Sequence, residues 1–343
     1  MTRILKKYID EFDAGRDLVR TDAEPFFDAL IHETDEALLT SVFQTWNVKG
    51  IGEDEIYQIA RMMRDRCTRV SSKHKVFVDV VGTGGSKSKT FNVSTAAAFV
   101  VAGAGVPVAK HGNRAATSST GSADVLSALG VEHAVDSATA ERCLNEIGIC
   151  FMFAPNFHRL SPTLATVRRG LGFPTIFNCV GPLCNPAQAP HQLIGVWSRE
   201  LVPKIANALA RLGTKRSWVV HGSDGLDEIS VSGSTYVAEV NDRVKEFEIE
   251  PSNFGASVRS ADRIRVNTAE ESAQIIRSVL ESELVNDQRT RAEDIVIANA
   301  AAALHIAGRG DDLTDSARLA ARSIADRHAM RKLDSLAAAV TPR

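Results

Sequence analysis

From Lys75 onward, short β-branched runs alternate with helix-like stretches, and this alternation limits the possible folds more than any other feature. The runs are candidates for buried strands because each is short, apolar and bounded by glycine or polar residues. They are Val76–Val81, Val106–Lys110, Cys150–Phe153, Gln192–Trp197, Trp218–His221 and Thr235–Val240. The stretches with helical character are Ser94–Gly103, Asp124–Leu129, Ala138–Ile147, Leu201–Leu212 and Ala292–Ile306. This alternation predicts an α/β fold with a mainly parallel central sheet covered by helices.

The first 72 residues follow a different pattern. Apolar side chains recur at three- and four-residue spacing in Ala23–Leu30, Ala37–Trp46 and Ile56–Met63, which predicts helices. A second unusual stretch, Thr175–Ala189, is rich in Pro, Gly and Asn and is typical of a crossover connection.

Composition excludes several classes of protein. The 343-residue chain has a formal net charge of -2, so nothing global directs it to nucleic acid or an anionic membrane. No apolar run approaches the roughly 20 residues that span a bilayer, and Met1–Arg16 lacks a signal-peptide core. The five cysteines show no CxxC spacing, which favours reduced, buried thiols and a cytoplasmic location.

The segment Val81–Thr95, VGTGGSKSKTFNVST, joins a predicted strand to a predicted helix. Its glycines allow close approach of the backbone to a ligand, and the helix adds free amides and a positive dipole end. The spacing matches neither the P-loop nor the dinucleotide-binding motif. We therefore predict a phosphate cradle, and the alternative is a glycine turn in which Ser94 only caps the helix.

Two further polar segments follow predicted strands. In Lys110–Asp124, KHGNRAATSSTGSAD, Lys110 and Arg114 supply positive charge beyond a strand's carboxyl end, where open α/β sheets bind ligands. In His221–Ser230, HGSDGLDEIS, the adjacent acids Asp227 and Glu228 offer oxygen ligands suited to magnesium. A solvated loop and a surface acidic pair are the plainer alternatives for these two segments.

Taken together, these segments resemble the anthranilate phosphoribosyltransferase family. The resemblance rests on seven segments in the family's order between about residues 76 and 235: GTGGS at 82–86, TFNVST at 90–95, KHGNR at 110–114, SSTGSAD at 118–124, VRRGLG at 167–172, TIFNCVGPLCNPA at 175–187 and GLDEIS at 225–230. The first 70 residues and the tail match only in general helical character.

The resemblance implies a fold like that of the nucleoside phosphorylases and phosphoribosyltransferases. A small helical domain would take residues 1–72 plus about 162–190, and a larger α/β domain would take 73–161 plus 191–343. Relatives are usually dimers through the helical domain. The reaction transfers the 5-phosphoribosyl group from phosphoribosyl pyrophosphate (PRPP) to the amine of anthranilate, with release of pyrophosphate, in tryptophan biosynthesis.

The family's functional positions carry over residue by residue. Those implied to bind PRPP are Gly82, Gly85, Ser86, Thr90, Asn92, Val93, Ser94, Thr95, Lys110, His111, Gly112, Asn113, Arg114, Thr117, Ser118, Ser119 and Ser122. Those implied to bind anthranilate are Gly82, Asn113, His158 and Arg168, with Arg168 pairing the carboxylate. Two Mg²⁺ ions are implied, one on Ser94 and Glu228 and one on Asp227 and Glu228. His111 and His158 are candidates to accept the amine proton, and structural histidines are the alternative.

The chain departs from the family pattern at two places. Ser86 and Lys87 replace the Asp and Gly of GTGGDG, and Arg159–Ser161 replaces the residues that usually follow the histidine in His-Pro-Ala-Met. These departures leave open a paralogue that uses another aromatic amine. A non-catalytic nucleic-acid-binding relative and a pyrimidine nucleoside phosphorylase are further alternatives, and the retained Lys110, Arg168, Asp227 and Glu228 speak against the first of these.

Overall fold

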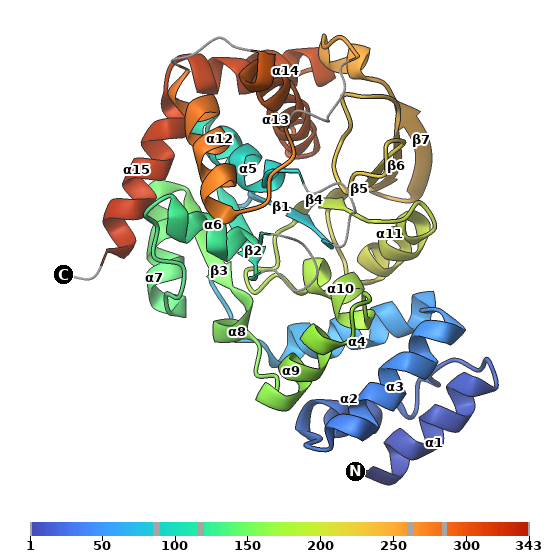
Figure 1. The fold of residues 1–343 in the computed structure, drawn as a ribbon. Coiled ribbons are helices and arrows are strands. Elements are labelled where there is room, and N and C mark those ends of the chain that lie inside the picture. Colours follow the sequence, from blue (N-terminus) through green and yellow to red (C-terminus); the bar gives the residue numbers. More distant parts are fainter. Residues whose placement is uncertain (1, 85–89, 115–119, 259–263, 283–286, 342–343) are drawn as a thin grey trace.

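A seven-stranded sheet forms the centre of the computed structural model, which describes residues 2–84, 90–114, 120–258, 264–282 and 287–341. The strand order is β3-β2-β1-β4-β5-β6-β7, and the strands from β3 to β5 are parallel (Figure 1). The bounds are β1 Val78–Gly82, β2 Val108–Gly112, β3 Ile149–Phe153, β4 His191–Gly195, β5 Arg216–Gly222, β6 Thr235–Val240 and β7 Val244–Ile249. The predicted mainly parallel α/β fold is therefore confirmed.

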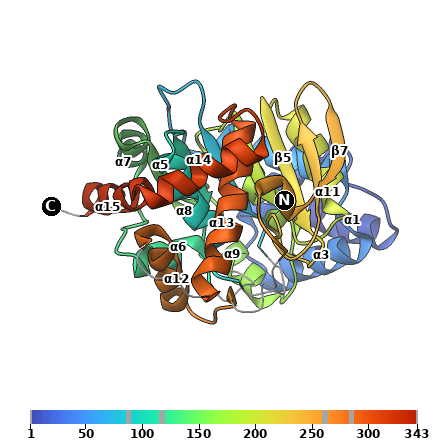
Figure 2. The same cartoon turned by 90° about the horizontal axis from the view of Figure 1, so that it is seen from above.

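Helices cover both faces of the sheet, which explains why its strands are apolar almost throughout. On one face, α5 contacts β1 and α13 contacts β4, and α14 and α15 pack beside these two helices (Figure 2). On the other face, α11 contacts β5 and β6. The bounds of these helices are α5 Val93–Gly103, α11 Leu201–Arg211, α13 Asp287–Ile306, α14 Leu313–Ala325 and α15 His328–Val340.

The N-terminal helices pack together beside this α/β part, and a returning segment joins them (Figure 1). Helix α9 contacts α3, and α10 and the 3-10 turn η2 contact α4. The bounds are α1 Thr2–Asp13, α2 Ala23–His32, α3 Glu36–Lys49, α4 Glu53–Arg66, α9 Pro162–Gly170, α10 Ile176–Val180 and η2 Gly181–Cys184.

Shorter elements complete the chain. They are α6 Ser122–Ala128, α7 Ser137–Arg142, the π-helical turn η1 Cys143–Ile147, α8 Ala154–Phe157, the 3-10 turn η3 Pro251–Phe254 and α12 Ala269–Glu281. No helix in the parts of the chain that the structure covers is both long enough and apolar enough to cross a membrane. All five cysteines are free and buried, as their spacing predicts.

Buried apolar side chains gather into two clusters. One lies between the sheet and the α5–α13 side. The other fills the N-terminal helices and continues onto the α11 face of the sheet, where Ile194, Val219 and Ala238 join it. Successive residues of one strand point to opposite faces and enter different clusters, since Leu193 belongs to the first and Ile194 to the second.

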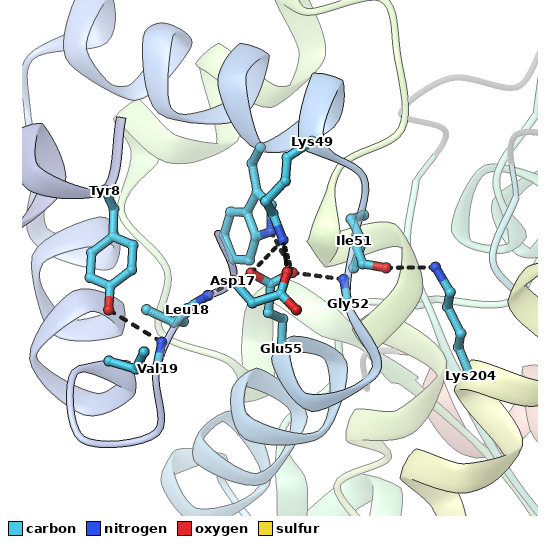
Figure 3. Close-up of polar contacts among 10 residues, drawn as sticks. Tyr8, Asp17, Leu18, Val19, Lys49, Ile51, Gly52, Glu55 and Lys204 are labelled. Atoms are coloured by element: carbon cyan, nitrogen blue, oxygen red, sulfur yellow. Dashed lines mark hydrogen bonds and ion pairs between the residues drawn. The ribbon is translucent and has the colours of Figure 1, made fainter. Parts of the chain in front are cut away.

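A buried carboxylate ties the N-terminal helices together (Figure 3). Glu55 is fully buried and accepts hydrogen bonds from the Leu18 amide, the Trp46 indole and the Lys49 ammonium. The α3–α4 turn that carries this cluster also meets α11, because Lys204 Nζ donates to the Ile51 carbonyl at 2.9 Å. The turn therefore links the helical bundle to the α/β part.

The expected elements differ from the observed ones in several places. The helices that were not predicted as individual elements are α1, α8, α9, α12, α14 and α15. Ala138–Ile147 is predicted as one helix, but it divides into α7 and the π-helical turn η1. The Thr175–Ala189 crossover contains α10 and η2. The last two strands are antiparallel, and β7 was not predicted because its Lys and Glu side chains are exposed and the strand is not an apolar run.

Candidate functional site

The polar loops singled out in the sequence meet at the carboxyl ends of β1, β2, β4 and β5. Parallel strands bring these ends to one edge of the sheet. The Thr83 amide donates to the Gly195 carbonyl at 2.9 Å, and the Gly84 amide donates to Asp227 Oδ2 at 3.1 Å. The loop after β5 therefore closes over the ends of β1 and β4.

Two glycines lie against Asp227 where the loop closes. A Cβ atom at Gly195 would lie 1.6 Å from the Asp227 carbonyl oxygen, and one at Gly82 would lie 2.9 Å from Asp227 Oδ2. Real Cβ atoms do not approach other atoms so closely. Gly195 is thus needed to let the acidic loop approach, because it faces the Asp227 backbone, whereas at Gly82 the Asp227 carboxylate could turn away.

Glu228 and Asp227 form the acidic part of the site. Glu228 Oε1 accepts a hydrogen bond from the Ser94 amide at 3.2 Å, at the amino end of α5. Burial, and then the neighbouring Asp227, raise the pKa of Glu228 to about 8. Two carboxylates held together against their repulsion fit a divalent cation, since a bound cation would favour their ionised forms.

The donor set specifies which cation would fit. The described residues contain no group of three or more His, Cys, Asp and Glu side chains arranged to hold a metal. Mg²⁺ needs no such protein cage, because it binds through one or two carboxylates plus water and substrate phosphates. Ser94, Asp227 and Glu228 offer oxygen atoms only, so the residues fit magnesium.

Lys110 supplies buried positive charge next to the acidic pair. Its ammonium donates to the Val80 carbonyl at 2.5 Å and to Ser94 Oγ at 3.3 Å. Burial lowers the pKa of Lys110, and the charges of Asp79 and Glu228 oppose that shift. The site therefore places an ammonium, a hydroxyl and two carboxylates around the start of α5.

The amino end of α5 forms the floor of the predicted phosphate cradle. Asn92 is the N-cap, and its Oδ1 accepts hydrogen bonds from Thr120 Oγ1 at 2.8 Å and from Ser272 Oγ at 3.0 Å. Ser94 lies two residues inside the helix, so its interpretation as a plain cap is wrong. Among the described residues, the buried hydroxyls of Thr83 and Thr95 have no hydrogen-bond partner.

Other predicted PRPP positions lie close to these residues. Val93 begins α5, and Thr90 forms an isolated antiparallel bridge with Arg265. Gly112 ends β2, where a Cβ atom would lie 2.2 Å from Ser122 Oγ. Ser122 Oγ in turn donates to the Asn113 carbonyl at 3.3 Å.

Arg114 is exposed and turns toward His133 and Asp124. Its Nη2 atom lies 3.5 Å from His133 Nε2, and its Nε atom lies 4.0 Å from Asp124 Oδ1. The predicted positions Gly85, Ser86, Thr117, Ser118 and Ser119, together with the departure at Lys87, lie outside the described residues.

The two histidines predicted to accept the amine proton lie next to each other. The rings of His111 and His158 are 5.1 Å apart between centroids. Burial keeps the pKa of His111 well below its ordinary value and lowers that of His158 to about 4. Both imidazoles are therefore neutral at pH 7. In the described structure, Nε2 of each ring is buried without a hydrogen-bond partner.

Arg168 lies on α9 with its guanidinium 4.6 Å from the centroid of the Phe177 ring. Burial lowers its pKa to about 10, so the guanidinium stays positive at neutral pH. Its Nε is buried and has no partner within the described residues. A buried donor without an acceptor, on a charged group, suits a planar carboxylate.

Three polar residues at the site were not predicted. Asp79 and Asn185 are fully buried, and Thr83 is nearly so. An acidic residue inside the run VDVV and the Asn of PLCNPA are the signals that could have revealed Asp79 and Asn185, because a polar side chain in an apolar setting needs a partner.

A parallel sheet with a phosphate cradle and an acidic pair at its carboxyl edge defines a class of group-transfer enzymes. Residues 74–330 match the family described as "Glycosyl transferase family, a/b domain". The chain is 46% identical over 329 residues to the anthranilate phosphoribosyltransferase of Anaeromyxobacter sp. (strain K), covering 95% of this chain and 96% of the relative. The chain therefore belongs to the anthranilate phosphoribosyltransferase family.

Solved structures of the same family share the whole fold. The anthranilate phosphoribosyltransferase of Thermus thermophilus has a TM-score of 0.87 and 34% identity, covering 97% of this chain and 99% of that chain. The Saccharomyces cerevisiae enzyme, solved in complex with PRPP and Mg, has a TM-score of 0.88 and 28% identity, covering 98% of both chains.

Proposed function

We propose that this chain transfers the 5-phosphoribosyl group from PRPP to the amine of anthranilate, giving N-(5-phosphoribosyl)anthranilate and pyrophosphate in tryptophan biosynthesis. The observation that carries the proposal is the cluster of Lys110, Ser94, Asp227 and Glu228 at the amino end of α5. This cluster lies on a chain similar over nearly its full length to enzymes of that name. Its ammonium suits a polyanionic donor, and its two carboxylates suit the magnesium that would accompany that donor.

The donor side of the site would act on the leaving group. The bond between C1 of the ribose and pyrophosphate breaks, so positive charge develops on the sugar and negative charge on the departing oxygens. The Lys110 ammonium and the positive dipole end at the start of α5 stabilise that negative charge, because they are fixed before the reaction begins. We assign the PRPP positions given above to this side.

Ser94, Asp227 and Glu228 would hold magnesium. When bound with PRPP, the metal supplies charge neutralisation at the pyrophosphate. We extend the proposal to two ions, with Glu228 shared between them. The protein's own part is to hold both carboxylates in place, through the Ser94 amide for Glu228 and the Gly84 amide for Asp227.

The acceptor side would orient the aromatic amine. Arg168 would pair the anthranilate carboxylate, and Gly82, Asn113 and His158 would contact the same molecule. Fixing the amine nitrogen near C1 lowers the barrier by removing the entropy cost of encounter. The nitrogen lone pair forms the new bond to C1, and the amine then loses one proton. A neutral His111 or His158 can accept it at a free Nε2.

The proposal also covers organisation in the cell. We place the helical domain at residues 1–72 plus about 162–190 and the α/β domain at 73–161 plus 191–343. We further propose a cytoplasmic homodimer that associates through the helical domain, as the family resemblance implies. Light scattering on the purified protein measures the dimer directly, and a monomer mass at micromolar concentration would contradict it.

The function is tested by a fluorescence assay. Protein, Mg²⁺, PRPP and anthranilate are mixed, and the loss of anthranilate fluorescence is followed. We expect a decay that requires all four components. A flat trace despite measurable PRPP binding would instead indicate a different acceptor, and a flat trace without PRPP binding would contradict phosphoribosyl transfer altogether.

A further inference from the structure

The short turn η2 lies between the helical segment α9–α10 and strand β4, and its carbonyl groups accept hydrogen bonds from buried side chains. The last carbonyls of a helical segment have no partners within it, so they must find others. The Gly181 carbonyl lies 3.2 Å from His111 Nδ1, and the Pro182 carbonyl accepts from Gln192 Nε2 at 3.0 Å. The Leu183 carbonyl accepts from Arg64 Nε, and the Cys184 backbone hydrogen-bonds the His158 ring.

The contact with Gly181 determines the state of the His111 ring. A carbonyl oxygen can only accept a hydrogen bond, so Nδ1 of His111 carries the hydrogen. In a neutral imidazole the other nitrogen then has a free lone pair. That nitrogen, Nε2, is the buried atom without a partner among the described residues. The position of one peptide group in η2 thus decides which nitrogen of His111 is available.

Asn185 directly follows η2, and together with Asp79 it ties the end of this turn to the sheet. Both side chains are fully buried. Asn185 Nδ2 donates to Asp79 Oδ2 at 2.8 Å and to the Ala109 carbonyl on β2 at 2.8 Å. Its Oδ1 accepts from the Ala187 amide at 2.8 Å. The side-chain amide therefore joins β1, β2 and the end of the crossover at a single point.

Asp79 completes a ring of contacts around His111. Its Oδ1 accepts the His111 backbone amide at 3.3 Å while its Oδ2 accepts Asn185. The backbone and the ring of His111 are thereby both fixed, the first by Asp79 and the second by the turn that Asn185 anchors. These contacts span residues 79 to 185, far apart in the chain.

We propose that Asn185 and Asp79 are positioning residues for the acceptor side: by anchoring the Gly181–Cys184 turn to β1 and β2, they keep His111 in the Nδ1–H tautomer with Nε2 free to accept a hydrogen from the aromatic amine. This inference rests on the proposed function for the identity of the amine. It assigns no role in PRPP binding to Asn185, since its three contacts are with Asp79, β2 and the crossover.

The test uses Asn185→Ala in the full-length protein, with two readouts. The first is the nitrogen-15 spectrum of histidine-labelled protein, in which the His111 signal is assigned through its loss in His111→Gln. Wild type should show Nδ1–H and a bare Nε2, and Asn185→Ala should show a mixture of tautomers. The second is steady-state kinetics, in which we expect the anthranilate KM to rise by about tenfold or more while the PRPP KM changes less than about twofold.

Asn145→Ala is the matched control. Asn145 also binds backbone at both ends of its amide, accepting from Lys73 N at 2.8 Å and donating to the Ser71 carbonyl at 3.1 Å, but it does not contact η2. The Asn145→Ala variant should lose stability, but its His111 signal should not move and its anthranilate KM should not rise relative to its PRPP KM. If Asn185→Ala fails to fold, Asn185→Ser replaces it, because the shorter hydroxyl cannot bridge to Asp79.

Two outcomes would overturn the inference. One is an unchanged His111 tautomer in the folded Asn185 variant. The other is an equal rise of both KM values, which would indicate a general structural loss. A wild-type protein that is inactive with anthranilate would contradict the proposed function instead, and the tautomer readout would still decide the positioning role.

Discussion

Replacing Glu228 by Gln should stabilise the metal-free protein, and the gain should depend on pH. The Gln side chain keeps an oxygen that can accept the Ser94 amide, but it carries no charge to bury beside Asp227. In the folded protein the pKa of Glu228 is about 8, well above its ordinary value of 4.5. A raised carboxyl pKa means that the folded state holds the proton more tightly than the unfolded chain does. Stability is therefore lost as pH rises from 4.5 toward 8.

The size of the effect follows from the shift. Between pH 4.5 and 7.5 the folded state keeps a proton that the unfolded chain has released. Each of these three pH units lowers the free energy of unfolding by at most about 1.4 kcal/mol, so the upper bound on the loss is about 4 kcal/mol. Water still reaches part of this half-buried side chain, so we expect about 1–3 kcal/mol at pH 7.5. At pH 5.5 the same calculation allows at most about 1.4 kcal/mol.

The assay is urea unfolding of wild type and Glu228→Gln in EDTA at both pH values. The exposed Glu246 provides a control, because Glu246→Gln removes a carboxylate that has no burial cost. We expect the variant's advantage in free energy of unfolding to grow from pH 5.5 to 7.5, and the control to show no such growth. An advantage that is equal at both pH values, or a variant less stable than wild type, would refute the reasoning.

Three further predictions concern the same site. Asp227→Asn combined with Glu228→Gln should abolish turnover in a folded protein, and circular dichroism with the fluorescence assay checks this; full activity would remove the metal assignment. Arg168→Ala should raise the anthranilate KM far more than the PRPP KM, whereas equal rises would assign Arg168 another role. Gly195→Ala should lower the free energy of unfolding by more than about 1–3 kcal/mol and remove most of the activity, because its Cβ would lie 1.6 Å from the Asp227 carbonyl oxygen. Thermal unfolding of Gly195→Ala is compared with that of the control Gly170→Ala, whose added Cβ would meet no atom within 4 Å.

Local pattern was sufficient for the fold class and for six of the seven strands, but not for helices such as α12, α14 and α15. The β-branched runs became β1 to β6 within a few residues of their predicted bounds, because strand length and apolar period are properties of neighbouring residues. The same holds for the start of α5 at Val93, one residue from its predicted start at Ser94. Strand β7 was missed because it contains charged side chains, and a partly exposed edge strand need not be an apolar run.

Tertiary structure alone decided how these pieces meet. Nothing in the sequence near Gly195 shows that Asp227 will pass over it. The resemblance places Ser94 and Glu228 at one metal ion, but only the folded chain shows that the Ser94 amide donates to Glu228. The sequence supplied His111 as a candidate, but its free nitrogen depends on the Gly181 carbonyl. That carbonyl belongs to a turn whose end is tied to the sheet through Asn185 and Asp79. Such contacts join residues that are distant in the chain, and only the packing of the crossover against the sheet brings them within hydrogen-bond distance.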